Sequence, residues 1–223
     1  MTLVKICGIT NLDDALAALD AGADILGFNF YPHSPRYIEP EHARVIIDRL
    51  PESVMKVGVF VNEDLENIQR IAATSGVSSL QLHGDESPEY CKELKLKRLY
   101  VTKVFSTGED FTLERVKEYD VPEIMLDAAG TAARGGTGNL SDWSKARQTV
   151  ELFPTMFLAG GLSPENVAAA IDAVDPFGVD ACSWLERQPG QKDHARVRAF
   201  VAAVHNARPH QPHHLENDDE WIS

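Results

Sequence analysis

The sequence has few cysteines, no long apolar run and no excess of basic residues. Its three cysteines, Cys7, Cys91 and Cys182, are odd in number and widely spaced among 223 residues. This set is not typical of a disulfide framework and favours a protein of the reducing cytoplasm. No segment approaches the roughly 20 consecutive apolar residues of a membrane-spanning helix. The first residues are not a basic stretch followed by an apolar one, so we expect no signal peptide.

The small number of basic residues excludes two classes of partner. Lysine and arginine total 21 against 34 acidic residues, which gives a formal net charge of −13. Nucleic acids and anionic membranes require a basic surface, so neither is expected as the main partner. An acidic protein can still bind a phosphate group where backbone N–H groups and one or two cations surround it. Hydrophobic residues make up 43% of the chain, which is enough for a sizeable core without disulfides.

Short apolar runs alternate with amphipathic stretches along most of the chain. The runs read LVKIC, ILGFNF, VMKVGVFV, SSLQLH, LYVTKVF, EIMLDA, TMFLAG and FGVDAC. Their β-branched and aromatic residues are typical of strands, and the apolar residues between the runs recur at helical spacing. DDALAALDAG, for example, predicts a helix that ends at Gly22, whereas FTLERVKEYD has the least regular helical pattern. The pattern therefore predicts about eight strand–helix units and a parallel sheet.

Eight such units favour a single α/β domain built as a closed (β/α)8 TIM barrel, at the small end of that fold's size range. A doubly wound open sheet is the structural alternative, but its first turn usually carries a glycine-rich dinucleotide motif. The corresponding turn here, CGITN, has one glycine. We therefore predict a barrel over residues 1–205. Over residues 206–223, where proline, histidine and acidic residues predominate, we predict a mobile, solvated tail.

Chemically active residues stand where the predicted strands end, which is where catalytic groups gather in a barrel of this kind. The residues at those ends, and in the loop after the second strand, are Cys7, Arg36, His83, Asp127, Gly160, Gly161, Asp180 and Ser183. A thiol and a carboxylate at one barrel mouth suit a pair that moves protons, as an isomerase requires. Taken alone, each has a simpler interpretation: Cys7 as a packed thiol, Asp127 as the cap of a turn and Arg36 as a surface residue.

Eight short motifs follow one another along nearly the whole predicted barrel. They are KICGIT, GFNFYPHSPRY, VGVFVN, QLHGDE, MLDAAG, GGTG, LAGGLSPENV and PGQKD. In this order they resemble phosphoribosylanthranilate isomerase, the Amadori isomerase of tryptophan biosynthesis. The resemblance implies a (β/α)8 barrel of the phosphate-binding type, with no metal and no organic cofactor. It also implies that Cys7 is the general base, Asp127 the general acid and Arg36 a cation that positions the substrate.

The family's substrate, N-(5′-phosphoribosyl)anthranilate, becomes 1-(2-carboxyphenylamino)-1-deoxyribulose 5-phosphate. Opening of the ribose requires a proton on the ring oxygen, so the Asp127 carboxyl needs a pKa raised by burial or by nearby negative charge. The Cys7 thiolate then removes the proton from C2′ of the protonated Schiff base. Lys5 precedes Cys7 by two residues and leaves the same face of the strand, where its charge favours the thiolate.

The resemblance and the chemistry of the substrate assign the other candidates. Arg36 follows Pro35 in a loop, and its guanidinium suits two-point binding of the anthranilate carboxylate. His83 is expected against the substrate or a neighbouring loop, and Asp180 against the ribose hydroxyls or as a cap of the last turn. The phosphate needs backbone N–H groups from glycine turns, commonly between strands seven and eight. The candidates for this role are Gly135, Gly136, Gly160, Gly161 and Ser183.

The segment at the end of the eighth strand departs from the family pattern. The family usually reads valine, aspartate, valine, two serines, glycine, valine and glutamate, whereas this chain reads VDACSWLE. Cys182 replaces a serine and Trp184 replaces a glycine, which permits a positive φ that tryptophan disfavours. We expect Trp184 to point away from the phosphate; a ring that crowds the phosphate is the alternative. Nothing near Cys182 in the sequence suggests a redox role, and Cys91 is interpreted as packing.

Two other functions fit the predicted fold. The first is a related sugar-phosphate barrel, but histidine-pathway isomerases resemble a two-aspartate arrangement with an acid where this chain has Cys7. Epimerases use a metal held by clustered histidine and aspartate, and among histidines only His83 ends a predicted strand. The second is a barrel kept as a binding module, which only Trp184 encourages. We expect a phosphorylated sugar–anthranilate as the small-molecule partner, and a monomer or weak homodimer.

Overall fold

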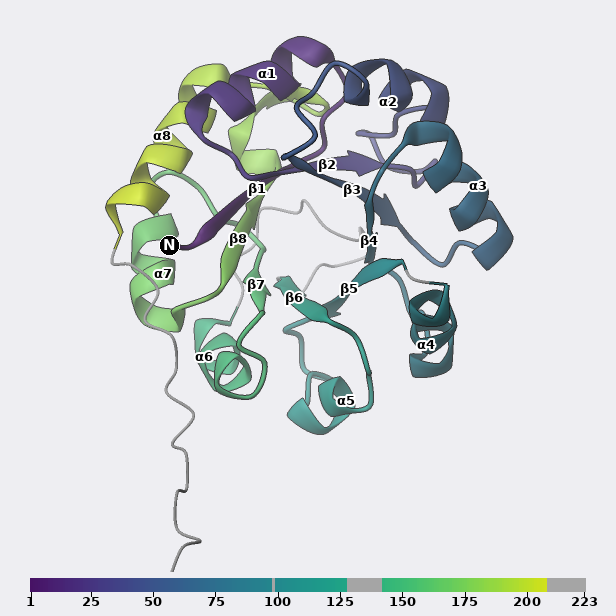
Figure 1. Ribbon diagram of the computed structural model, residues 1–223. Helices are drawn as coiled ribbons and strands as arrows, with labels where there is room; N and C mark the ends of the chain where they lie inside the picture. The colour runs from purple at the N-terminus through teal and green to yellow at the C-terminus, as the bar shows by residue number, and fades with distance from the viewer. Residues whose placement is uncertain (98, 128–141, 208–223) are drawn as a thin grey trace, which may run out of the picture.

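The computed structural model describes residues 1–97, 99–127 and 142–207. Eight parallel strands form a closed barrel in the order β1 to β8, and helices lie outside the ring of strands (Figure 1). The strands are β1 (Leu3–Cys7), β2 (Ile25–Asn29), β3 (Met55–Phe60), β4 (Ser79–Leu82), β5 (Tyr100–Ser106), β6 (Glu123–Asp127), β7 (Phe157–Leu158) and β8 (Gly178–Ala181). The helices are α1 (Leu12–Ala21), α2 (Pro40–Ile47), α3 (Leu65–Ser75), α4 (Pro88–Leu96), α5 (Leu113–Lys117), α6 (Trp143–Leu152), α7 (Val167–Val174) and α8 (His194–Asn206). The predicted (β/α)8 barrel is confirmed.

Capping residues fix where the helices begin and end. At the start of α1, the Asn11 side chain accepts a hydrogen bond of 2.9 Å from the backbone N–H of Asp14. Gly22 ends the same helix in the left-handed conformation, as the sequence predicts. Asp64 begins α3 and Asp193 begins α8 with the same kind of side-chain cap. The stretch with the least regular helical pattern gives α5, which is only five residues long.

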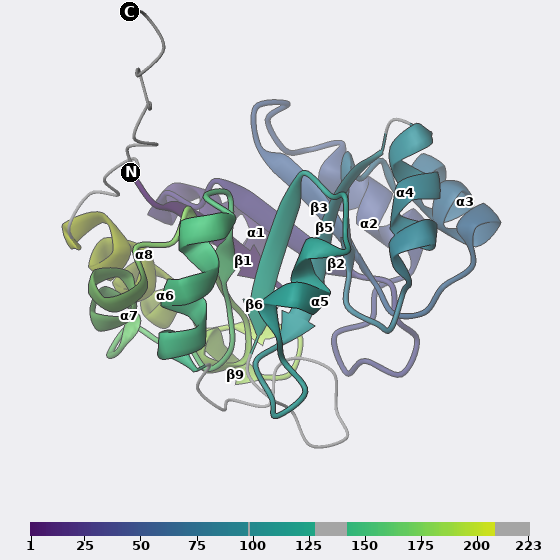
Figure 2. The same ribbon diagram turned by 90° about the horizontal axis from the view of Figure 1, so that it is seen from below.

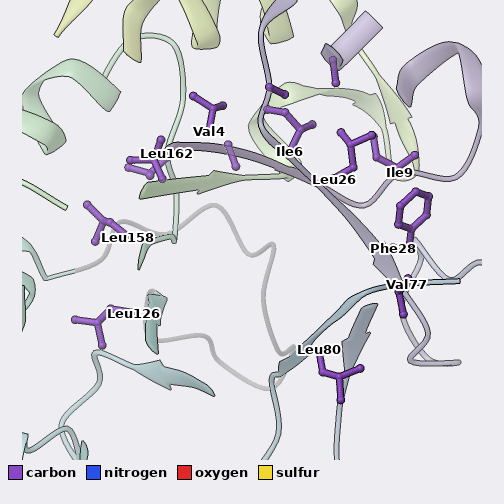
Figure 3. Close-up of a cluster of buried hydrophobic side chains, with 14 of the residues drawn as sticks. Val4, Ile6, Ile9, Leu26, Phe28, Val77, Leu80, Leu126, Leu158 and Leu162 are labelled. Atoms are coloured by element: carbon purple, nitrogen blue, oxygen red, sulfur yellow. The ribbon is translucent and has the colours of Figure 1, made fainter. Parts of the chain in front are cut away.

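Apolar side chains pack on both sides of the ring of strands. The larger cluster lies between the strands and the helices, and Figure 3 shows Val4, Ile6 and Leu26 on this outer side. A smaller cluster, which includes Ile25 and Phe157, fills the inside of the barrel. Because side chains alternate along a strand, the residues next to outward-facing ones point inward. The alternation therefore turns the odd-numbered residues at the end of β1 into the barrel.

A short structure that the sequence pattern did not predict follows β8. It consists of the 3-10 helix η1 (Ser183–Leu185) and an antiparallel hairpin of β9 (Glu186–Gln188) and β10 (Gln191–Lys192). Figure 2 shows β9 at the opposite end of the barrel from the N-terminus, where the carboxyl ends of the strands lie. The hairpin therefore carries its side chains to the mouth of the barrel.

The last helix covers the seam where β8 meets β1. α8 ends at Asn206, just past the predicted barrel boundary at residue 205, and residues 208–223 of the predicted tail lie outside the described residues. Val197, Phe200 and Val201 of α8 are fully buried. Within the described ranges, no helix has both the length and the apolar character needed to cross a membrane.

Candidate active site

A cavity of about 500 Å3 opens at the carboxyl ends of the strands, a volume that suits a small-molecule ligand. Eight of the predicted site residues line it: Cys7, Arg36, His83, Asp127, Gly160, Gly161, Asp180 and Ser183. The other two, Gly135 and Gly136, lie outside the described residues. Barrel closure thus brings residues that are far apart in the sequence into one pocket.

The Cys7 thiol ends β1 and is buried beside other ionisable groups. Hydrogen bonding from the Cys182 thiol lowers the pKa of Cys7 well below its ordinary value, against the opposing effect of burial. The positive charges of Lys5 and Lys192 lower this pKa further. Cys7 is therefore surrounded by groups that favour its thiolate.

Lys5 forms a buried ion pair with Asp180 across the β1–β8 seam. The Lys5 Nζ lies 2.7 Å from Asp180 Oδ1, and the two side chains are only 3% and 10% exposed. Burial raises the pKa of Asp180 to about 6, although Lys5 opposes this shift. Burial alone would lower the pKa of Lys5, but Asp180 and Cys7 outweigh it and raise the pKa, so the lysine stays charged. A fixed positive charge therefore lies beside Cys7.

The Asp127 carboxyl ends β6 and lies against an imidazole from β4. His83 Nε2 is 3.2 Å from Asp127 Oδ2, and His83 Nδ1 is 3.3 Å from Gln81 Nε2. With the Gln81 amide in this orientation, Nδ1 accepts a hydrogen bond and Nε2 carries the proton that faces Asp127. The Gln81 carbonyl oxygen is buried and has no hydrogen-bond partner among the described residues. Gln81 itself is among the residues that line the cavity.

Arg36, in the loop after β2, is held by the hairpin at the end of β8. Its Nε lies 2.9 Å and 3.0 Å from the two carboxylate oxygens of Glu186, and its Nη2 lies 2.8 Å from Oε2. Lys192 Nζ donates to the same carboxylate at 2.9 Å. Burial disfavours the charged form of Glu186, but Arg36 and Lys192 together leave its pKa lowered. Nη1 of Arg36 donates to no acceptor among the described residues, so the Nη1–Nη2 end of the guanidinium is available to a ligand.

Two glycines after β7 form a turn that lines the cavity. Gly160 and Gly161 have φ values of 86° and 68°, in the left-handed region that favours glycine. Asn166 fixes the turn, because its side chain accepts from the Ser163 N–H at 2.8 Å and donates to the Gly161 carbonyl at 2.9 Å. Within the described ranges, the N–H groups of Gly161 and Ser183 donate to no acceptor. Such N–H groups suit a bound phosphate.

Trp184, where the family pattern has glycine, lies at the edge of the cavity. Among the described non-glycine residues only Asn62 and Asp175 have a positive φ, so Trp184 adopts its place in η1 without that strain. Its side chain is half exposed, and its carbonyl accepts a hydrogen bond of 2.5 Å from Arg196 Nε. The tryptophan therefore shapes the rim of the pocket without being buried in it.

Sequence reasoning missed three residues of this site: Gln81, Glu186 and Lys192. Gln81 belongs to QLHGDE and Lys192 to PGQKD, so both stood in motifs that carried the resemblance. Their roles depend on contacts across the barrel mouth, which no local pattern predicts. Glu186 ends VDACSWLE, where it matches the glutamate of the family pattern, but its contacts with Arg36 and Lys192 likewise join separate segments of the chain.

The fold and the site together define a class of protein. A closed (β/α)8 barrel has at its mouth a thiol with a lowered pKa, a carboxyl group, buried cations and a glycine turn with available N–H groups. This combination is typical of a barrel enzyme that moves protons on a phosphorylated substrate. The described residues contain no cluster of three or more histidine, cysteine, aspartate or glutamate side chains arranged to hold a metal ion.

Comparison with known proteins identifies the family. The family model for N-(5′-phosphoribosyl)anthranilate isomerase matches residues 4–203. The isomerase of Desulforudis audaxviator is 49% identical over 209 residues, which cover 93% of this chain and 100% of that protein. The chain therefore belongs to the N-(5′-phosphoribosyl)anthranilate isomerase family.

Two solved structures share the barrel over nearly their full length. Monomers generated from the dimeric isomerase of Thermotoga maritima are 43% identical, with a TM-score of 0.82 over 92% of this chain and 99% of that one. A phosphoribosylanthranilate isomerase in complex with reduced 1-(o-carboxyphenylamino)-1-deoxyribulose 5-phosphate is 42% identical, with a TM-score of 0.81 over the same shares.

Proposed function

We propose that this protein converts N-(5′-phosphoribosyl)anthranilate to 1-(2-carboxyphenylamino)-1-deoxyribulose 5-phosphate, an Amadori rearrangement in tryptophan biosynthesis. One observation carries the proposal together with the family membership: Cys7 and Asp127, from β1 and β6, line the same cavity. An aldose–ketose isomerisation needs an acid at the ring oxygen and a base at C2′, and the cavity offers one of each.

Asp127 acts first, as the general acid. Its carboxyl donates a proton to the ribose ring oxygen while the C1′–O bond breaks, which leaves a protonated Schiff base between the sugar and the anthranilate nitrogen. His83 lies 3.2 Å from the carboxylate and orients it toward the cavity.

Cys7 acts second, as the general base. The cationic nitrogen of the Schiff base makes the C2′ proton acidic, and the thiolate removes it to give an enolamine. Tautomerisation of the enolamine gives the ketose product. The lowered pKa of Cys7 favours the thiolate that this step requires.

The substrate's two anionic ends bind on different parts of the mouth. The Nη1–Nη2 end of Arg36 binds the anthranilate carboxylate, and Glu186 holds the other edge of the same guanidinium. The backbone N–H groups of Gly161 and Ser183 bind the phosphate, with Gly160 shaping the turn.

Asp180 lines the cavity, supports the base through its ion pair with Lys5, and offers its second oxygen to a ribose hydroxyl. The chain works as a monomer or weak homodimer, since few large apolar side chains, such as Val45 and Leu152, are exposed among the residues that the structure describes. Its cysteines are free thiols, and we place the activity in the reducing cytoplasm, where a catalytic thiol is preserved.

Single-turnover kinetics on Cys7→Ser and Asp127→Asn test the proposal. Each variant is expected to lose at least about 100-fold in turnover rate, the scale typical of an acid–base group, while still binding the reduced product analogue. Cys91→Ser is the matched control, because Cys91 is a buried thiol on α4 away from the cavity, and it is expected to retain turnover. Full activity in either site variant, or no turnover in the folded wild-type protein, would refute the proposal.

A further inference from the structure

Two of the three thiols lie at the ends of neighbouring strands, because Cys7 is the last residue of β1 and Cys182 directly follows β8. β1 and β8 pair in parallel, with Ile6 opposite Ala181, so the next residues, Cys7 and Cys182, come side by side at the mouth. Neighbouring strands lie about 4.8 Å apart. That spacing falls within the Cα separations, about 4.4–6.8 Å, that disulfides bridge.

Both cysteines also line the cavity. A Cβ atom placed on Gly8 would come within 2.9 Å of Cys182 Sγ, which shows that the Cys182 side chain reaches over the end of β1. Hydrogen bonding between the thiols lowers the pKa of Cys7 and raises the pKa of Cys182. The pair therefore resembles a nucleophilic thiolate beside a protonated partner thiol.

We infer that Cys7 and Cys182 form a reversible intramolecular disulfide when the protein meets a peroxide, so that this pair is a redox modification site. Both cysteines are free in the structure. In the sequence, the wide spacing of the cysteines argued against a disulfide. In the fold, closure of the barrel brings residues 7 and 182 close together. The bridge does not depend on the proposed function, whereas its effect on turnover does.

The chemistry balances with hydrogen peroxide as the oxidant. The Cys7 thiolate attacks one peroxide oxygen, the O–O bond breaks, and the departing hydroxide takes up a proton to form water, which leaves a sulfenic acid on Cys7. The Cys182 sulfur then attacks the sulfenic sulfur. An S–S bond forms, the S–O bond breaks, and the Cys182 proton leaves with that oxygen as a second water. Two electrons pass from the thiols to the peroxide.

The buried lysines determine which of the two sulfur atoms reacts with the peroxide first. Lys5 and Lys192 both favour the thiolate at Cys7, which makes it the sulfur that meets the oxidant first. Lys192 Nζ lies 3.8 Å from Cys182 Sγ, close enough to stabilise negative charge as that thiol loses its proton. When Cys7 is in a disulfide, it has no thiolate that can accept the C2′ proton. The bridge is therefore expected to stop isomerisation until a thiol reductant opens it.

The test treats the reduced full-length protein with hydrogen peroxide, alkylates the remaining thiols under denaturing conditions, and maps the products by mass spectrometry. We expect one disulfide between Cys7 and Cys182, an alkylated Cys91, and recovery of all thiols after dithiothreitol. Turnover measured on the same samples is expected to fall in proportion to the bridged fraction and to return on reduction.

Two variants sharpen the result. Cys91→Ser is expected to form the same bridge as the wild-type protein. Cys182→Ser cannot form it, so its Cys7 is expected to advance to the sulfinic acid, and dithiothreitol should not restore that variant's own starting turnover. Circular dichroism checks that both variants are folded.

Mass-spectrometric mapping of the oxidised cysteines in the wild-type protein is enough to test whether the disulfide forms, without any variant. A sulfinic Cys7 beside an unmodified Cys182, or a disulfide that joins two chains on a non-reducing gel, would overturn it. A mapped Cys7–Cys182 bridge in a protein that never shows turnover would leave this inference standing and remove the proposed function instead.

Discussion

Two buried lysines add to the effect of the Cys182 thiol in lowering the pKa of Cys7, and each is held charged by its own carboxylate. Lys5 pairs with Asp180 at 2.7 Å and Lys192 pairs with Glu186 at 2.9 Å. A buried lysine without such a partner would lose its proton and its influence. The carboxylates thus act at a distance from the reacting atoms, by keeping positive charge beside the base.

Replacement of Lys5 by glutamine tests this arrangement. The base must be a thiolate, so kcat/KM rises with pH through the pKa of Cys7, and the lowered pKa places this limb well below the ordinary thiol value of 9.0. Removal of the Lys5 charge disfavours the thiolate and raises the pKa of Cys7. We therefore expect the acidic limb of the kcat/KM profile to move to higher pH, with the largest loss of activity at low pH.

Lys56→Gln is the matched control for that measurement. Lys56 is also a buried lysine on a strand, but its Nζ bonds to the Pro51 carbonyl at 2.6 Å, at the start of β3. Its replacement should leave the acidic limb where it is in the wild-type protein. A Lys5→Gln profile that keeps the wild-type limb and loses activity equally at every pH would show that Lys5 has only a structural role.

At the scale of elements, the turn after β1 decides whether the mouth can form. Gly8 has a φ of 80°, and a Cβ atom on it would lie 2.8 Å from Arg36 Cδ and 2.9 Å from Cys182 Sγ. Both distances are shorter than real Cβ contacts, so one of these side chains would have to move. The strand end therefore needs glycine for its conformation and for the space that the guanidinium occupies.

Gly8→Ala and Gly76→Ala separate these two requirements. Gly76, which ends α3, has a φ of 81°, but its nearest neighbour lies 3.4 Å away, at Arg44 Nη1. Each alanine adopts a left-handed conformation at a cost of about 1–2 kcal/mol, so both variants should lose unfolding free energy. Only Gly8→Ala is expected to raise KM as well, because it displaces Arg36. Denaturant unfolding and steady-state kinetics measure the two effects, and an equal KM in both variants would contradict the steric account.

At the scale of the whole molecule, the sequence pattern predicted the repeated strands and helices because each unit carries its own periodicity. The runs from LVKIC to FGVDAC each coincide with most or all of a barrel strand. Residues that end those runs could be placed at one mouth because parallel strands share a direction. Cys7 and Asp127 were therefore accessible to sequence reasoning.

The hairpin after β8 was not predictable from the same signals. Its strands are three and two residues long, too short for a periodic pattern. The contact between Arg36 and Glu186 spans 150 residues, and the contact between Cys7 and Cys182 depends on barrel closure. Such contacts belong to the tertiary structure, so no local stretch of sequence specifies them.

Closure also predicts where the chain can be shortened. α8 buries Val197, Phe200, Val201 and Val204 over the seam where β8 meets β1. Burial of each such side chain stabilises the fold by about 1.5–3 kcal/mol, so their joint loss is comparable with the whole stability of a domain, about 5–15 kcal/mol. A chain that ends at Asp193 is therefore expected not to fold.

A chain that ends at Ala207 keeps α8 complete and removes only residues 208–223, which lie beyond the end of the family match at residue 203. We expect it to unfold at the same temperature as the full-length protein and to keep the same kcat/KM. Calorimetry and the isomerase assay on the two shortened chains check both expectations. A lower unfolding temperature for the chain that ends at Ala207 would mean that the last sixteen residues contribute to stability, and the division of the sequence into a barrel and a dispensable tail would then be wrong.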